Sequence, residues 1–475
     1  MMIGSFLGLQ TALRALMAQR KATETAGHNI ANANTPGYSR QRVALHASDT
    51  PYTVPSLGRP EVPGQLGTGV DIAAIERVRD GFLDLQVRNE QGNLGNWEVR
   101  RDSLQKVEVI LVEPSDNGLN YAMAAFWNAW QELTKNPESL AIRSEVRQRG
   151  ITLAETVQHL YSQLGQLQED LNFNVGVTVE QINTIAEQLA DLNQQIARSV
   201  AVGDNPNDLR DRRDLLIDEL AKLVDVTVTE QSDGTVDVAI GGRNLVQGTA
   251  VDSLQAVPDP LNNNFYEVQW SSDGSPVNFK NGSLAGMVWA RDTGVADVMS
   301  RLDELAATLI NEVNAVHRAG YGLDGSTGND FFAGTGAADI WVAAGILSDL
   351  NTIAAAGDPA KLPGDGSNAL ALAQLKDALT MPPSAPSGTF GDYYRSLVAT
   401  VGINTEQAVR MAENEEILTN QLENRRQAVM GVSIDEEMAN IIKFTHAYQA
   451  AARVLTTLDE QLDIIINRMG LVGRG

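Results

Sequence analysis

The fold is decided by residues 160–196, which read LYSQLGQLQEDLNFNVGVTVEQINTIAEQLADLNQQI. Mostly apolar residues recur there in steps of three and four over five heptads, at Leu160, Leu164, Leu167, Leu171, Val175, Thr178, Ile182, Ile185, Leu189, Leu192 and Ile196. A seam that repeats every 3.5 residues keeps one helix face against a partner helix. The stretch therefore predicts one long helix, and the seam is interpreted as the core of an intramolecular bundle rather than as a zipper between subunits.

Outward from this seam, the pattern stays helical on both sides. Helix is predicted from about Ala74, and after the break at 205–207 a shorter helix over 208–223 should return antiparallel to the long one. The period then changes to two, so residues 226–282 are predicted to form a β-rich insert.

The complete pattern predicts a mainly α fold with a β-rich insert. In that fold the terminal helices pair as a coiled coil, a long-helix bundle follows, and a small β domain lies in the middle of the chain. The predicted segments are an N-terminal helix and turn (1–50) that pairs with 433–475, a connector (51–73), a helical bundle domain (74–225), the β-rich insert (226–282), a further bundle helix (283–319), a Gly/Ala/Pro-rich insert expected to be irregular or loosely folded (320–392), a returning bundle helix (393–432) and a C-terminal coiled-coil helix (433–475).

The N-terminal helix carries its own apolar face. The face comprises Ile3, Phe6, Leu9, Leu13, Leu16, Ala26 and Ile30. The helix is predicted to end after Asn32, because the sequence Thr35-Pro36-Gly37-Tyr38 suits a type II turn with proline and glycine at its central positions. A short extended segment is expected over Gln41 to Ala47.

The C-terminal helix has the clearest start signal. Ser433 and Glu436 form a predicted capping box, and Asp435 and Glu437 are interpreted as solvated or capping residues near the positive helix end. The predicted seam, interrupted near Leu458, comprises Met438, Ile441, Thr445, Tyr448, Ala452, Leu455, Leu462, Ile465 and Met469. A single helix cannot bury such a seam, so it needs either the N-terminal helix or a neighbouring subunit.

Composition excludes several classes of function. The formal charge of −24 repels nucleic acid and anionic membrane surfaces, so neither is predicted as a partner. The chain has no cysteine and its five histidines lack any ligand spacing, so no metal, cofactor or catalytic residue is predicted. It also lacks an apolar run of about 18 residues, and its N-terminus does not have the pattern of a cleaved secretory signal.

Two segments at opposite ends resemble one family. The stretch from His28 to Arg40, HNIANANTPGYSR, resembles the N-terminal signature of the flagellar rod, hook and hook-associated proteins. The stretch from Asp435 to Val454, with DEEMANII and AYQAAARV, is similar to that family's C-terminal signature. The resemblance implies an assembly motif at Ala31, Asn32, Thr35, Pro36, Gly37, Tyr38, Ser39 and Arg40, and assembly seams at Phe6, Leu9, Leu13 and Leu16 and at Met438, Ile441, Tyr448, Ala452, Leu455, Leu462, Ile465 and Met469.

Within the family, the segments 67–72, 77–80, 82–84 and 207–214 are similar to the hook-associated member that joins hook to filament. Such a protein is exported unfolded by the flagellar type III apparatus without signal cleavage. It assembles outside the cell, at the distal end of the hook, as a ring of its own copies. The implied partners are other copies of the chain, the hook protein, the next junction protein (hook-associated protein 3) and an export chaperone.

Two alternatives stay open. The chain could be another axial protein, the hook or distal rod protein, but those are expected to have mostly β middle sections. It could also be a wall hydrolase, for which 320–400 is the only unassigned region. That region shows no cysteine, no histidine and no convincing carboxylate pair, so the chain is expected not to be an enzyme.

Overall fold

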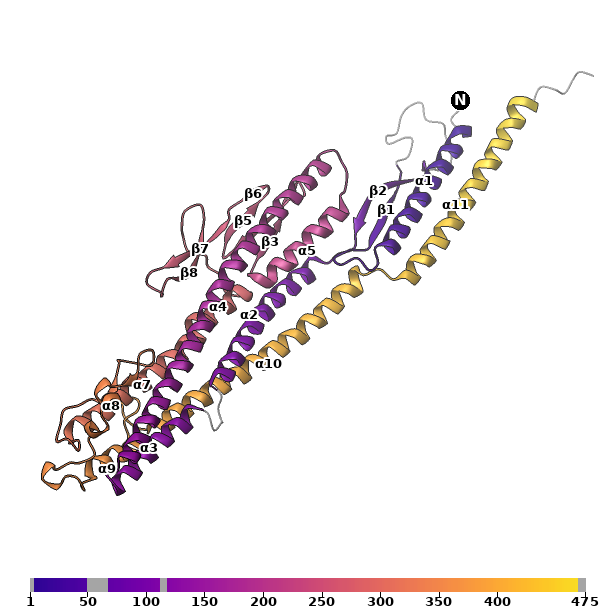
Figure 1. Cartoon of the computed structure of the whole chain (residues 1–475). Coiled ribbons are helices and arrows are strands. Elements are labelled where there is room, and N and C mark those ends of the chain that lie inside the picture. The colour runs from indigo at the N-terminus through magenta and orange to yellow at the C-terminus, as the bar shows by residue number, and fades with distance from the viewer. Residues whose placement is uncertain (1–3, 49–66, 112–117, 469–475) are drawn as a thin grey trace, which may run out of the picture.

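The computed structural model describes residues 4–48, 67–111 and 118–468. The molecule is elongated, with long helices running along it, small β elements at their side, and the two terminal helices extending from one end (Figure 1). The fold is mainly helical with β structure in the middle of the chain and paired terminal helices, so the predicted fold class is confirmed.

Eleven α-helices are present in the described residues: α1 (Gly4–Ala31), α2 (Gly81–Leu111), α3 (Leu119–Lys135), α4 (Leu140–Ala201), α5 (Asn207–Leu223), α6 (Ser283–Trp289), α7 (Ala296–Ala319), α8 (Ala344–Ser348), α9 (Ser367–Gln374), α10 (Phe390–Met430) and α11 (Ile434–Asp463). The strands are β1 (Gln41–Ala47), β2 (Val70–Arg77), β3 (Thr227–Glu230), β4 (Val236–Ile240), β5 (Arg243–Gln247), β6 (Ala250–Val251), β7 (Leu254–Asp259), β8 (Phe265–Trp270), β9 (Phe332–Ala333) and β10 (Trp341–Val342). A π-helical turn over Ala290–Val295 joins α6 to α7, and another over Ile464–Arg468 follows α11.

Helix α4 runs for 62 residues, from a start at Leu140 that Ser139 caps by accepting a hydrogen bond from the Ile142 amide. The predicted seam is buried along its length, apart from Leu192, which is half-buried. Its partners belong to the same chain, because α3, α5 and α7 all pack against α4. The interpretation of the seam as an intramolecular core is therefore confirmed.

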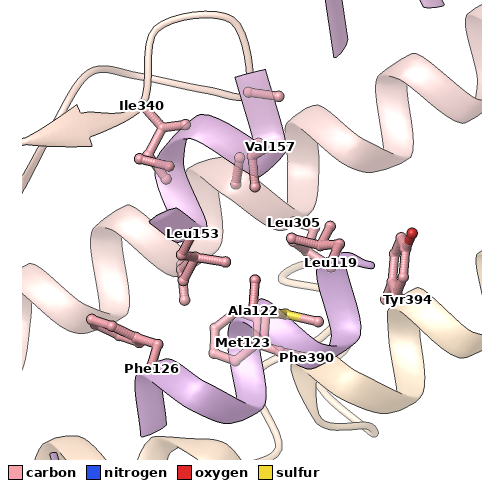
Figure 2. Packing of buried hydrophobic residues seen from close by; sticks show 14 of the residues in the cluster. Leu119, Ala122, Met123, Phe126, Leu153, Val157, Leu305, Ile340, Phe390 and Tyr394 are labelled. Carbon is pink, nitrogen blue, oxygen red and sulfur yellow. The ribbon is translucent and has the colours of Figure 1, made fainter. Parts of the chain in front are cut away.

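Two hydrophobic cores divide α4 between them. The first joins α3, α7, α10 and the half of α4 that ends at Leu171; in Figure 2, Phe126, Leu153, Val157, Leu305 and Phe390 meet inside it. The second begins at Val175 and joins the remaining half of α4 to α5 and the β elements. Burial of one large apolar side chain contributes about 1.5–3 kcal/mol, so each core stabilises one half of the long helix.

The β-rich insert forms two antiparallel units beside α4. One sheet has the order β3-β4-β5-β6, and the second is the hairpin β7-β8. Asn193 of α4 fixes the first sheet, since its amide group donates to the carbonyl oxygens of Val236 and Gly248 and accepts from the Val236 amide. A fully buried side chain with all these bonds specifies the register between helix and sheet.

Residues 320–392, which were predicted to be irregular or loosely folded, are irregular but not loosely folded. This segment has only short helices and strands, but Phe331, Phe332, Ile340 and Met381 are buried in the first core. Asn314 of α7 accepts from the amides of Phe331 and Phe332. Glycines and alanines here permit close packing instead of disorder, because backbone hydrogen bonds and a few aromatic side chains replace regular structure.

The predicted helix start near Ala74 is also wrong. Residues 70–77 form β2, which pairs antiparallel with β1, so that Arg42 lies opposite Glu76. Helix α2 starts later because the Asp80 carboxylate accepts hydrogen bonds from the amides of Phe82 and Leu83, which satisfies two free donors at the helix end. Most of the predicted connector (51–73), namely residues 51–66, lies outside the described residues.

His317 of α7 anchors the segment that follows it. It is fully buried; its Nδ1 lies 2.7 Å from the Asn329 carbonyl oxygen, and its Nε2 accepts from the Ala354 amide at 2.9 Å. Burial lowers the pKa of His317 from 6.5 to about 4, against the opposing effect of the Asn329 carbonyl. The folded protein therefore holds this imidazole neutral, with Nε2 as an acceptor.

We predict that the free energy of unfolding falls as pH drops from about 6.5 to about 4. Over that range the unfolded chain binds a proton that the folded chain does not, which gives a slope of up to about 1.4 kcal/mol per pH unit. The substitution His317→Gln should flatten this slope in urea denaturation series, whereas His159→Gln, at an exposed position of α4, should leave it unchanged. Equal slopes for the wild type and His317→Gln would contradict the assignment.

Candidate functional site

The two ends of the chain form one unit, which we call the terminal unit: α1, the β1-β2 hairpin and α11. Helix α1 packs along α11 and also contacts both strands of the hairpin. The unit projects from the end of the bundle at which α10 stops and α11 begins (Figure 1). Segments more than 400 residues apart in sequence are therefore neighbours.

The buried face of α1 differs in part from the predicted one, although Ala26 is buried as predicted. Alanines at 12, 18, 22 and 26 are almost fully buried, whereas Leu13 is 45% exposed. Leu9 and Leu16 are half-buried, and the side chain of Phe6 lies outside the described residues. Small side chains let α1 approach α11 closely, and the larger apolar residues consequently point elsewhere. A search for large apolar residues therefore missed the alanines at 12, 18 and 22.

The predicted seam of α11 divides into two parts. Ile441, Ala452, Leu455 and Leu462 are half-buried, while Met438, Tyr448 and Ile465 are 41–53% exposed; Met469 lies outside the described residues. Leu458, where the pattern was interrupted, faces α1, since its Cδ1 would lie 3.3 Å from a Cβ on Gly8. The seam that faces α1 therefore includes Leu458 and leaves several predicted positions on the outer surface.

The predicted turn follows α1. Its hydrogen bond runs from the Tyr38 amide to the Thr35 carbonyl oxygen, and Gly37 has φ +75°, so the type II turn is confirmed. A Cβ on Gly37 would lie 3.1 Å from the Leu215 Cβ, so the turn packs on α5. Ala31, Thr35 and Pro36 are exposed, and Asn32 is half-buried and caps the end of α1 through the His28 carbonyl oxygen.

Asn29 lies at the centre of this region and is 1% exposed. Its Nδ2 donates to the Gln41 carbonyl oxygen (2.8 Å) and to Glu437 Oε2 (3.2 Å). Its Oδ1 accepts from the Gln41 amide (2.9 Å) and from the Tyr38 hydroxyl (2.8 Å). All four hydrogen-bonding positions of the amide group are used, so Asn29 fixes α1, the turn, β1 and α11 in one arrangement.

Arg40 connects still more of the structure. Its Nε donates to Glu437 Oε1 at 2.7 Å and its Nη1 to Glu436 Oε2 at 3.0 Å. Its amide donates to the Met430 carbonyl oxygen at the end of α10, and its carbonyl oxygen accepts from the Val78 amide after β2. We call Asn29, Arg40 and Glu437 the joint, because they link the start of α11 to α10, α1 and the hairpin.

The contacts of Glu436 and Glu437 differ from those predicted from the sequence. Glu437 is 3% exposed, so the expectation that it is solvated or a capping group is wrong. Ser433 Oγ does accept from the Glu436 amide, at 3.4 Å, but the Glu436 carboxylate pairs with Arg40 instead of completing the capping box. The nearby guanidinium is a stronger partner for a carboxylate than a neutral backbone amide.

A second set of ion pairs fastens the turn to the bundle. Ser39 is fully buried and donates from its amide and its hydroxyl to the Asp211 carboxylate of α5. Asp211 and Asp214 share Arg77, and Asp214 also pairs with Arg79. Burial opposes ionisation, but the guanidinium groups of Arg79, Arg77 and Arg88 lower the pKa of Asp214 to about 2. For Asp211, burial outweighs its hydrogen bonds and raises the pKa.

The contacts of these residues hold α1, the turn, the β1-β2 hairpin and α11 against one another and against α5. Among the described residues, no three histidine, cysteine, aspartate or glutamate side chains gather so that they could hold a metal ion. In the same part of the chain, no helix combines the length and the apolar character needed to cross a membrane.

Of the predicted motif, Tyr38, Ser39 and Arg40 lie within these contacts, but Asn29, Glu437 and Asp211 were missed. A usable signal existed for Asp211: the acidic residues at 208, 211, 214 and 218 follow steps of three and four, which places them on one face of α5. Arg77, Arg79 and Arg88 supply the opposite charge to that face. No local pattern distinguishes Glu437 from its two acidic neighbours.

Three family models match this chain. The model of the flagellar hook-associated protein FlgK helical domain matches residues 104–332, that of the flagella basal body rod protein matches 9–38, and the C-terminal model of the flagellar basal body rod FlgEFG proteins matches 427–469. The two shorter matches lie largely in α1 with its turn and in α11.

Relatives named flagellar hook-associated protein 1 match the whole length. That of Bacillus subtilis is 36% identical over 100% of both chains, and that of Escherichia coli K12 is 27% identical over 97% of this chain and 99% of its own. The solved structure of the flagellar hook junction protein FlgK from Burkholderia pseudomallei has a TM-score of 0.64 at 18% identity, covering 73% of this chain and 100% of that one.

We predict that Glu437→Gln loosens the joint and that Glu436→Gln does not. Glu437 is buried with two partners, so loss of its charge should lower the free energy of local opening of residues 28–41 by about 1–3 kcal/mol. Glu436 is 63% exposed, so its loss should change that value by less than about 1 kcal/mol. Native-state amide exchange measures both, and equal effects of the two substitutions would contradict the joint.

Proposed function

Since the chain belongs to the flagellar hook-associated protein 1 family, which forms the junction between hook and filament in the bacterial flagellum, we propose that it builds this junction by polymerising through its terminal unit. The bundle and the β elements then form the outer part of each subunit. The function is structural and serves flagellum assembly and motility.

The observation that supports polymerisation is the apolar surface of the terminal unit. Glu437 is the one buried residue of α11, a helix of 30 residues. Among the side chains that the structure describes in α1 and from α11 onward, the exposed large apolar ones are Leu13, Met17, Ile434, Met438, Ile442, Tyr448, Val454, Ile464, Ile465 and Ile466. A monomer that leaves this much apolar surface in water gains free energy when neighbouring copies cover it.

The proposal includes partners and a location. Besides its own copies, the chain contacts the hook protein on one side and hook-associated protein 3 on the other, and an export chaperone binds it before secretion. It functions outside the cell after export without a cleaved signal peptide, and it is not an enzyme. The family's place in the flagellum supports these statements.

Deletion of residues 433–469 should produce cells that have hooks but no attached filaments. The bundle should still fold, because both hydrophobic cores lie outside the deleted segment. Electron microscopy of cells that carry only the truncated chain scores hooks and filaments, and circular dichroism of the purified chain checks its helices. Normal filaments on such cells would contradict the proposed function.

In the dilute monomer, the amides of α11 after Glu437 should exchange quickly and those of α4 between 160 and 196 slowly. Helix α4 is packed along its length, whereas α11 is mostly exposed. Exchange followed by mass spectrometry gives the comparison, and protection of α11 equal to that of α4 would show that the terminal unit needs no neighbour.

A further inference from the structure

A groove of about 320 Å³ opens on one flank of the terminal unit. Its walls are Ala22 and Ala26 of α1, Val43 and Leu45 of β1, and Phe444 of α11. Arg42 stands at its rim with a side chain that is 70% exposed. The groove is thus an apolar slot with an arginine at its edge, which pairs with the Glu76 carboxylate at 3.5 Å. It lies next to the joint, since Arg40 and Glu437 are among its lining residues.

The same level of α11 carries an apolar stripe, which consists of Ile434, Met438 and Ile442. These residues are four apart, so they lie in line on one helix face, and they are 46%, 53% and 57% exposed. The exposed carboxylate of Asp435 lies beside the stripe. Core side chains are almost fully buried, so the described chain leaves these three side chains uncovered by comparison.

The stripe and the groove face different directions. At 3.6 residues per turn, the stripe lies about 140° around α11 from Asn440 and Phe444, which face the groove. A molecule therefore cannot place its own stripe in its own groove. Two different surfaces that meet between copies form a heterologous contact, and repetition of such a contact generates rings or helical tubes.

We propose that the stripe of one copy occupies the groove of the next copy, and that this contact sets the lateral order of subunits in the junction. The inference rests on the proposed function and adds the two surfaces and their polarity. Both surfaces lie between residues 434 and 444 of α11, so neighbours can meet with little shift along the axis. The contact also brings the Asp435 carboxylate toward the guanidinium of Arg42, which stays 70% exposed although it pairs with Glu76 at 3.5 Å.

The absence of cysteine allows a direct test by crosslinking. The double variant Leu45→Cys/Met438→Cys carries one thiol in the groove and one on the stripe. The matched control is Leu45→Cys/Val454→Cys, because Val454 is also 53% exposed on α11 but lies outside the stripe. Flagella isolated from cells that carry each variant as their only copy are treated with a short bis-thiol crosslinker and analysed by denaturing electrophoresis.

Leu45→Cys/Met438→Cys should give a ladder of covalent oligomers on the gel, because the crosslinker joins every chain to the next. The control, Leu45→Cys/Val454→Cys, should give no such ladder. Closed dimers alone would show a symmetric contact and would overturn the proposal, as would a link to a protein of different mass. Absence of any product in cells that still assemble filaments would overturn the inference and leave the proposed function standing. If Leu45→Cys/Met438→Cys prevents motility, the pair Val43→Cys/Ile442→Cys tests the same contact.

Discussion

The structure depends on the continuous burial of one face of α4. A helix of 62 residues is about 93 Å long, and no single core can cover it. The chain covers the first half with α3, α7 and α10 and the second half with α5 and the β elements. This division also places the sheet that Asn193 holds and the segment that His317 and Asn314 anchor.

The terminal unit is stabilised by a different kind of interaction. Its apolar contacts come from the alanines of α1 and from half-buried residues of α11 such as Leu458. Its polar contacts concentrate at the joint, where Glu437 pairs with Asn29 and Arg40. Buried ionic contacts add little net stability compared with apolar packing, but they require one geometry. The joint therefore fixes the direction in which α11 leaves the bundle, and the apolar surface of the unit remains for neighbouring copies.

The sequence predicted the parts of the fold that follow from a regular period. The seam of α4, the turn at Pro36-Gly37 and the strands after residue 226 were all found, because each depends on neighbours in sequence. The errors have physical causes. Strand β2 depends on pairing with β1, which is not its neighbour in sequence. The buried face of α1 is made by small residues, and Glu437 is buried because Arg40 and Asn29 lie opposite it.

The two kinds of stabilisation have a consequence for assembly. If the terminal unit were closed by its own apolar core, it would offer nothing to a neighbour; if it were unconstrained, each subunit would lose more conformational entropy on joining the tube. A polar joint avoids both outcomes, because it orders the base of α11 and leaves Met438 and Ile442 in water. Ser39, next to Arg40 of the joint, is hydrogen-bonded to Asp211 of α5. The bundle therefore has a fixed orientation relative to the joint. A copy that binds through its terminal unit consequently also positions its outer domains.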